Sequence, residues 1–228
     1  SRLATYDKAA GETYYALSLT PQVRPRSERV QQVAVVVDTS ASQYGLFRKD
    51  ALVAVDHVLN ELDPHDRVQV LAADLEPVPL TESFVAANSP AVEDARQRLA
   101  QRAPLGSTDM LGVLHAVVEC FEGQSDKPRS IIYVGDGVSR ANMFGDSETK
   151  ELVEKLVDKR ISVSSYAIGP ERNVAFLAVL GNQTGGRLYV DSDSESAAQE
   201  AGVGLARAAQ LPVFWPRDVQ FPAAMVEH

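Results

Sequence analysis

Two uninterrupted apolar runs constrain the fold of this chain more than any other feature. Residues 33–37 read VAVVV, and residues 131–134 read IIYV. A strand with one face in water alternates apolar and polar residues, whereas an unbroken apolar run is typical of a strand buried on both faces. Such strands occur in parallel sheets that carry helices on each side. We therefore expect an α/β fold.

The rest of the chain alternates between strand and helix patterns. Leu152, Val153, Leu156 and Val157, for example, have helical spacing. Strands are predicted at 32–38, 67–73, 130–136, 161–168 and 187–190, with a short one near 78–83, and helices at 46–61, 90–101, 110–122, 147–158, 172–182 and 195–209. This alternation predicts a doubly wound, mainly parallel, Rossmann-like sheet with helices on both faces.

The two ends of the chain differ from this central part. Residues 14–20 alternate like a strand, and residues 21–29 have the prolines and the basic residues of a linker. Residues 213–221 carry apolar side chains between prolines, which favours one or two edge-type strands. We predict an N-terminal β segment and linker at 1–29, an α/β domain at 30–210 and a C-terminal β extension at 211–228.

Polar residues follow the first apolar run directly. Asp38, Ser40 and Ser42 are spaced two apart, and in extended chain such residues project to the same side. One carboxylate and two hydroxyls can therefore converge at the carboxyl edge of the sheet, where open α/β sheets bind ligands. An all-oxygen cluster suits a hard divalent cation, most naturally magnesium. The alternative is that these residues only cap the following helix, since Asp and Ser are common N-caps.

Two later segments favour the cation over the cap. The second apolar run ends in Asp136, and Gly137 after it permits a tight turn. Because parallel strands end at the same edge of a sheet, Asp136 can lie beside Asp38. Thr108, in the loop before a helical pattern, can add a third hydroxyl.

The ordered set Asp38, Ser40, Ser42, Thr108 and Asp136 resembles the metal-ion-dependent adhesion site of von Willebrand factor A domains, and all five positions match. The resemblance continues through the segments SYAIG, FLAVL and TGGRLY further along the chain, and it covers roughly residues 30–210.

Two positions depart from the pattern of these domains. Asp109 stands where many relatives carry Asn, and it either makes the site more negative or caps the next helix. Gln43 replaces a methionine that often follows the second serine. Neither change removes a ligand.

The resemblance implies a binding domain without catalytic residues. Magnesium, with manganese or calcium as alternatives, would be held by Ser40, Ser42 and Thr108, with Asp38 and Asp136 bound directly or through water. Because hydroxyl ligands are neutral, the ion keeps a net positive charge. It also keeps an open position, which an acidic side chain of a partner protein would fill.

A shorter likeness concerns the N-terminal segment. The strand at 14–20 followed by Pro21 resembles the start of the A domain in inter-alpha-trypsin inhibitor heavy-chain-like proteins. It implies a larger multidomain chain in an extracellular, cell-surface or periplasmic location. Two other classes stay open: a scaffold domain with a vestigial site, and an intracellular subunit of a metal-chelatase or ATPase assembly.

Composition excludes several other functions. A net charge of −9 over 228 residues argues against nucleic-acid binding, which depends on clustered Lys and Arg. No run of about 18 apolar residues is present, so no membrane span is predicted. Cys120 is the only cysteine, which excludes an internal disulfide.

The remote enzymatic alternative is a magnesium-dependent phosphotransferase of the haloacid-dehalogenase type. Such enzymes also place an Asp at the end of the first strand, but they need a second acid two residues later. Here that position is Ser40, which cannot protonate a leaving group near neutral pH. Phosphate-loop, zinc-protease and hydrolase-elbow motifs are absent as well, so we predict no enzymatic activity.

Overall fold

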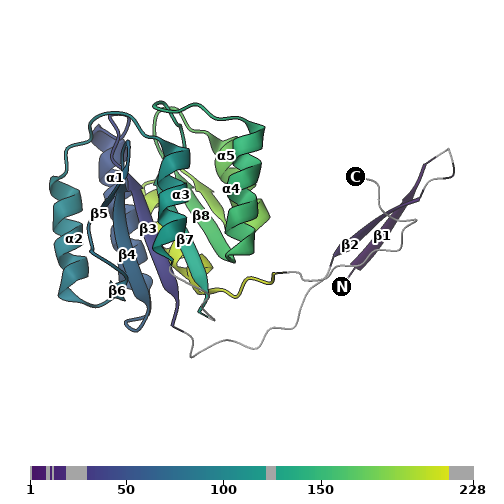
Figure 1. Ribbon diagram of the computed structural model, residues 1–228, viewed down its shortest axis with the longest axis horizontal. Helices are drawn as coiled ribbons and strands as arrows, with labels where there is room; N and C mark the ends of the chain where they lie inside the picture. Colours follow the sequence, from purple (N-terminus) through teal and green to yellow (C-terminus); the bar gives the residue numbers. More distant parts are fainter. Residues whose placement is uncertain (1, 9–10, 12, 19–29, 122–126, 216–228) are drawn as a thin grey trace.

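The computed structural model describes residues 2–8, 11, 13–18, 30–121 and 127–215. One part is an antiparallel hairpin of β1 (Arg2–Asp7) and β2 (Thr13–Ser18). The other is a seven-stranded sheet that lies between two layers of helices (Figure 1). The predicted α/β fold with a mainly parallel, doubly wound sheet is confirmed.

The large sheet has the order β5-β4-β3-β7-β8-β9, and β6 also pairs with β4. Its strands are β3 (Gln32–Asp38), β4 (Arg67–Ala73), β5 (Pro77–Pro79), β6 (Val85–Ala86), β7 (Arg129–Gly135), β8 (Ile161–Ala167) and β9 (Leu188–Val190). All neighbours are parallel except β5 and β6, which run antiparallel to β4. The short strand predicted near 78–83 is confirmed in part: β5 covers only 77–79, because Pro77 and Pro79 lack a backbone donor and limit it to a short edge strand, and β6 was not predicted.

The helices of the described residues are α1 (Gly45–Glu61), α2 (Pro90–Gln101), α3 (Met110–Cys120), α4 (Asp146–Asp158), α5 (Val174–Thr184) and α6 (Ala197–Gln210). Each begins and ends within two residues of its predicted bounds. In Figure 1 they flank the sheet, with α3, α4 and α5 together on one side.

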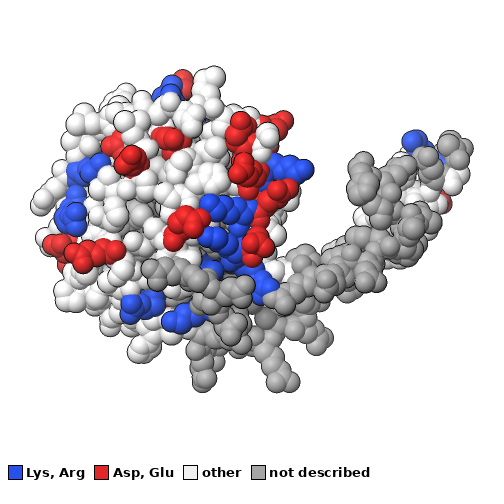
Figure 2. Space-filling view, viewed as in Figure 1, with Lys and Arg blue, Asp and Glu red and all other residues white. Residues whose placement is uncertain are grey.

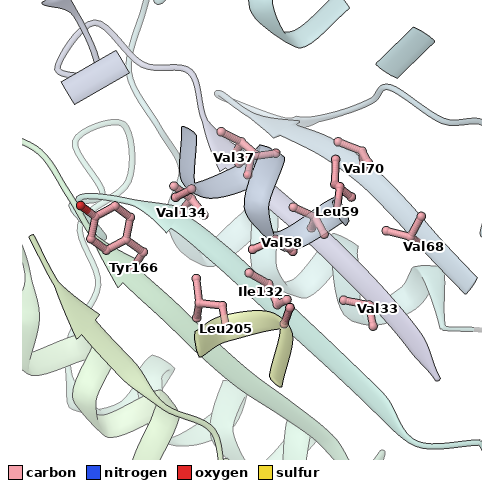
Figure 3. Close-up of a cluster of buried hydrophobic side chains, with 14 of the residues drawn as sticks. Val33, Val37, Val58, Leu59, Val68, Val70, Ile132, Val134, Tyr166 and Leu205 are labelled. Atoms are coloured by element: carbon pink, nitrogen blue, oxygen red, sulfur yellow. The ribbon is translucent and has the colours of Figure 1, made fainter. Parts of the chain in front are cut away.

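Each face of the sheet has its own apolar core. Val33, Val35 and Val37 point into a cluster that α1, α2 and α6 complete (Figure 3). Ala34 and Val36 point to the opposite face, where α3, α4 and α5 cover them. All five side chains are fully buried. The sequence of β3 is apolar at every position from 33 to 37 because both of its faces are covered.

The structure tests the predictions for the two ends only in part. β2 confirms the predicted strand over residues 14–18, and its partner β1 was not predicted. The linker predicted at 21–29 lies outside the described residues. Residues 213–215 form no strand, and the rest of the predicted C-terminal extension is also outside them. None of the helices in the described ranges combines the length and the apolar character needed to cross a lipid bilayer.

Candidate metal centre

The two acids of the candidate site follow neighbouring strands. Asp38 is the last residue of β3, and Asp136 follows β7, which pairs with β3 in parallel. Gly135 allows this approach, because a Cβ at this position would overlap the Cβ of Asp38 and the phenol oxygen of Tyr133. The two carboxylates therefore lie at one edge of the sheet, as the sequence predicts.

Asp38 is fully buried and accepts hydrogen bonds on both carboxylate oxygens. Its Oδ1 accepts from the Ser40 amide at 2.8 Å and from Thr108 Oγ1 at 3.0 Å. Its Oδ2 accepts from the Tyr133 hydroxyl at 3.3 Å, and that hydroxyl accepts from the Gly137 amide at 3.1 Å. These bonds hold the Thr108 hydroxyl and the turn after β7 against the end of β3.

The second half of the cluster is built on Asp136. Ser42 Oγ donates to Asp136 Oδ2 at 2.6 Å, and the Val138 amide donates to Asp136 Oδ1 at 2.8 Å. Ser40 Oγ lies 2.9 Å from Ser42 Oγ. Since the single proton of Ser42 is given to Asp136, Ser40 is the donor between the two hydroxyls. The structure thus brings all five predicted residues into one hydrogen-bonded cluster.

The interpretation of these residues as helix caps is wrong. The N-cap of α1 is Tyr44, which makes no side-chain cap bond, and the carboxylate and hydroxyls bind one another instead. Asp109 is the acid that caps a helix: its Oδ1 accepts from the Gly112 amide at 2.9 Å, at the start of α3. The capping role considered for Asp109 is therefore confirmed.

The loop that carries Thr108 is fixed to both sides of the site. The Leu105 amide donates to the Thr39 carbonyl at 3.0 Å, and the Gly106 carbonyl accepts from the Ala41 amide at 3.1 Å. On the other side, the carbonyl of Thr108 accepts from the amides of Arg140 and Ala141. Three separate loops therefore meet at the cluster and hold its oxygens in place.

The cluster contains two carboxylates, and none of its five side chains is cationic. Burial, and then the nearby charge of Asp136, raise the pKa of Asp38 from 3.8 to about 6. Burial also raises the pKa of Tyr133 well above its usual range, so the phenol stays neutral. Asp136 itself is only 2% exposed. Two acids placed this close in a buried site favour the binding of a cation between them.

The donor set fits a hard divalent ion. Every predicted ligand atom is a hydroxyl or carboxylate oxygen, which is the chemistry that magnesium, manganese and calcium prefer. Within the described ranges, no group of three or more His, Cys, Asp and Glu side chains has the arrangement of a metal site. An ion at this edge would depend on the three hydroxyls as much as on the two acids.

Sequence reasoning missed two residues that support the cluster. Tyr133 donates to Asp38, and Gln43 Nε2 donates to the Ile168 carbonyl at 3.0 Å at the end of β8. The signal for Tyr133 was present, because a tyrosine inside a buried aliphatic strand needs a partner for its hydroxyl. For Gln43 the sequence offers no such signal, since the partner carbonyl lies 125 positions away.

Similarity to known proteins agrees with this geometry. The von Willebrand factor type A domain family matches residues 31–190. Inter-alpha-trypsin inhibitor heavy chain H2 of Mus musculus is 24% identical over 176 residues, which are 73% of this chain and 19% of that protein. Heavy chain H4 of Bos taurus is 24% identical over 180 residues, or 75% of this chain and 20% of that protein. The chain thus spans about one fifth of the length of these curated relatives.

Solved structures show the same fold. A von Willebrand factor type A protein from Catenulispora acidiphila has a TM-score of 0.70 at 13% identity, over 79% of this chain and 43% of that one. The manganese-loaded TRAP protein of Plasmodium vivax has a TM-score of 0.54 at 15% identity, over 77% of this chain and 74% of that one. The family match covers well over half of the 228 residues. The chain therefore belongs to the von Willebrand factor type A domain family.

Proposed function

We propose that this chain is a non-catalytic protein-binding domain that depends on a divalent metal ion. The observation that carries the proposal is the hydrogen-bonded cluster of five oxygen-bearing side chains at one sheet edge: Asp38, Ser40, Ser42, Thr108 and Asp136. Magnesium is the proposed ion, with manganese or calcium as alternatives. The manganese-loaded TRAP protein has a related fold, which supports the choice of a divalent ion.

Each side chain has a proposed role. The hydroxyls of Ser40, Ser42 and Thr108 would ligate the ion directly, and Asp38 and Asp136 would bind it directly or through water. When bound, the ion supplies positive charge that attracts a carboxylate of a partner protein. The chain positions the hydroxyls through Asp38 and Asp136, which already accept hydrogen bonds from Thr108 and Ser42.

A phosphotransferase is the less favoured alternative. The position two residues after Asp38 is Ser40, whose hydroxyl bonds Ser42 and offers no acidic proton. Lys150, one of the lysines that such a mechanism could use, lies on α4 with its ammonium 3.9 Å from Glu154. A scaffold domain with a vestigial site and a chelatase- or ATPase-associated domain remain the binding-class alternatives.

We infer the location of the protein and the class of its partner with the help of its relatives. The similarity to inter-alpha-trypsin inhibitor heavy chains supports an extracellular, cell-surface or periplasmic protein in which this domain is one part of a longer chain. The proposed partner is a protein with an exposed acidic side chain. Nucleic acid is disfavoured because the net charge of −9 repels phosphates.

Calorimetry tests the metal site directly. Metal-stripped protein titrated with magnesium chloride should show one saturable site, and the Ser42→Ala and Asp136→Asn variants should show none. Asp109→Asn is the matched control, because its carboxylate caps α3 and takes no part in the cluster. Absence of heat with magnesium, manganese and calcium in folded wild-type protein would exclude the proposal.

A further inference from the structure

The two edges of the large sheet differ in their capacity to pair with a further strand. At one edge lies β5, where Pro77 and Pro79 lack the backbone donor that such pairing needs. At the other edge lies β9, which has no proline and pairs with β8 alone. Figure 1 shows β5 at one margin of the sheet and β8 toward the other. Because an unpaired edge strand is a template for another strand, the β9 edge is the candidate for an interaction surface.

Hydrogen bonds to β8 show which backbone groups of β9 face outward. The Arg187 carbonyl accepts from β8 at 2.8 Å, and the Asp191 amide donates to β8 at 3.0 Å. The backbone groups of successive residues in a strand point to alternate sides. Leu188 and Val190 therefore direct their amides and carbonyls away from β8. Within the described residues, no strand of the sheet lies beyond β9 to receive them.

The sequence of this edge is complementary to its own reverse. From Arg187 to Asp191 it reads RLYVD, so a basic and an acidic end flank two apolar residues and a central tyrosine. In an antiparallel pair centred on Tyr189, Arg187 faces Asp191 of a second copy. In the same register Leu188 and Val190 face each other and exchange their outward backbone groups. Opposite charges and apolar side chains that lie directly across a strand pair are stabilising.

The two faces of the edge suit this pairing in different ways. On the face of α5, Leu188 packs against the apolar cluster, and Val190 two residues on is 45% exposed. On the face of α6, a groove of about 470 Å³ lies between the strand and the helix, lined by Tyr189 and Arg207 among others. Tyr189 lies close to α6, because a Cβ on Gly204 would overlap its ring. One face thus offers apolar contact, and the other has room for longer side chains.

The charges around β9 are separated along its length. Arg187 and Arg207 lie toward the amino end of the strand, since α6 runs back to the start of β7. Both are exposed, and neither has an ion pair within the part of the chain that the structure describes. Asp193, Glu195 and Glu200 are exposed toward the carboxyl end. An antiparallel second copy reverses this order, so the basic end of each copy lies beside the acidic end of the other.

Asp191 already has contacts within its own chain. It accepts from the Tyr166 hydroxyl at 2.5 Å and lies 3.9 Å from the guanidinium of Arg172. A carboxylate has more acceptor positions than these contacts use. Asp191 can therefore also accept from Arg187 of a second copy.

The net charge of −9 opposes the association of two copies at low salt. Figure 2 shows acidic and basic side chains side by side on the visible face of the domain, so the excess of acids forms no continuous acidic surface there. At physiological ionic strength, interactions between exposed charges are screened beyond about 8 Å. The charges beside β9 therefore outweigh the distant ones, and their arrangement is complementary.

We propose that the β9 edge is a self-association surface, at which two copies of this chain pair antiparallel and join their sheets into one. Each copy contributes the same residues, and the two Tyr189 side chains meet at the two-fold axis. The apolar pairs lie on the face of α5 and the ion pairs on the face of α6. Because the strands run antiparallel, the carboxyl edges of the two sheets point in opposite directions. The dimer therefore presents its two candidate metal centres on opposite sides.

A cross-link at the two-fold axis tests the register. Tyr189→Cys in a Cys120→Ser background places two thiols directly opposite each other, at a Cα separation of about 4.5 Å that a disulfide can span. We expect oxidised glutathione to convert most of this variant into a covalent dimer. Val157→Cys in the same background is the control, because Val157 is 40% exposed on α4, away from β9. It should stay monomeric.

Sedimentation equilibrium of the full chain measures the association itself. We expect a dimer that is unchanged by EDTA or magnesium chloride, since β8 separates β9 from the strands that carry Asp38 and Asp136. Val190→Lys should weaken the dimer at least about tenfold, because a lysine on an edge strand opposes pairing. Val157→Lys is the matched control and should have no effect. Circular dichroism and thermal melting check that the variants fold.

The outcomes decide the inference without reference to the metal site. It is overturned if the wild-type chain stays monomeric at about 100 µM, a concentration at which even a weak dimer is populated. It is also overturned if Val157→Lys weakens the dimer as much as Val190→Lys, or if EDTA dissociates the dimer. Failure of Tyr189→Cys to cross-link in a folded, dimeric protein would exclude the antiparallel register. Magnesium binding measured by calorimetry tests the proposed function separately.

Discussion

At the scale of single residues, Asp38 has the environment that departs most from that of an ordinary surface acid. It is fully buried, and it accepts three hydrogen bonds while lying close to a second acid. A buried charge of this kind destabilises the metal-free fold unless a cation compensates it. If the site binds the proposed ion, the charge of Asp38 lowers the stability of the metal-free protein and raises its affinity for the ion.

The Asp38→Asn variant tests whether the charge of Asp38 lowers the stability of the metal-free protein. Asn keeps the shape of the side chain, and its amide oxygen can still accept from the Ser40 amide and from Thr108. We expect the metal-free variant to be more stable than the wild type by about 2 kcal/mol at pH 7, because the buried charge is gone. We also expect magnesium to stabilise only the wild type. Urea unfolding with and without magnesium chloride measures both effects.

The stability difference should depend on pH. In the metal-free wild type the pKa of Asp38 is raised from 3.8 to about 6, so between these values the folded state holds a proton that the unfolded chain has released. The wild type is thus not penalised below about pH 4, it loses stability as the pH rises from about 4 to about 6, and the loss is constant above that. Wild type and Asp38→Asn should have similar stability at pH 4 and diverge toward pH 7. A constant difference across this range would contradict a role for the charge.

The five predicted ligands could be found from the sequence, but the contacts that hold them in place could not. The spacing of Asp38, Ser40 and Ser42 after a buried strand is local information, which is enough to place one carboxylate and two hydroxyls. The buried position of Tyr133 signals that its hydroxyl needs a partner, but not that Asp38 of another strand is that partner, and the need for Gly135 depends on the same strand. Such contacts are absent from any local pattern.

At the scale of elements, α6 is packed more closely than its many alanines alone indicate. A Cβ at Gly202 would overlap the Ala54 carbonyl oxygen and lie 2.7 Å from the Cβ of His57, both on α1. A Cβ at Gly204 would overlap the ring of Tyr189 in β9. The small residues of this helix therefore set its register against α1 and β9.

Gly202→Ala should destabilise the fold. The added methyl meets backbone, so α6 has to shift, and overpacking of this kind costs about 1–3 kcal/mol, only partly offset by the better helix propensity of Ala. Gly181→Ala on α5 is the control, because the nearest atoms to its Cβ lie 3.8 Å away in ordinary contact. Thermal unfolding should show a lower Tm for the first variant only. If both variants behave alike, close packing does not fix α6.

The prediction of the elements succeeded where burial is strong. Strands β3, β4 and β7 are mostly apolar because helices cover them, and their bounds were predicted within one residue. β1 was missed because its sequence RLATYD lacks the regular alternation that predicted β2, which is equally exposed. The short β5 and β6 were poorly predicted because three and two residues are too few to show a period.

At the scale of the whole molecule, the two cores define the folding unit. Every buried member of both clusters lies between Val33 and Ala209. The division into 1–29, 30–210 and 211–228 stays a prediction, which shortened chains can test.

A chain shortened to residues 30–215 should keep its Tm within about 3 °C of the full chain, because it retains both cores. A chain that ends before α6 should fail to fold, since it loses Ala201, Leu205 and the rest of that helix from the first cluster. Differential scanning calorimetry compares the three. A clearly lower Tm for residues 30–215 would move the domain boundary outward.

The pairing of β3 with β7 has a further consequence for the kinetics of folding. Asp38 and Asp136 are far apart in the chain and meet only when these strands are side by side. An unfolded chain therefore offers magnesium only scattered ligands, and we expect the proposed site to form late in folding, after β3 and β7 have paired. The ion should then slow unfolding and leave the rate of folding nearly unchanged, which stopped-flow measurements in urea can follow. Magnesium would thus set the lifetime of the folded domain and not the speed of its assembly.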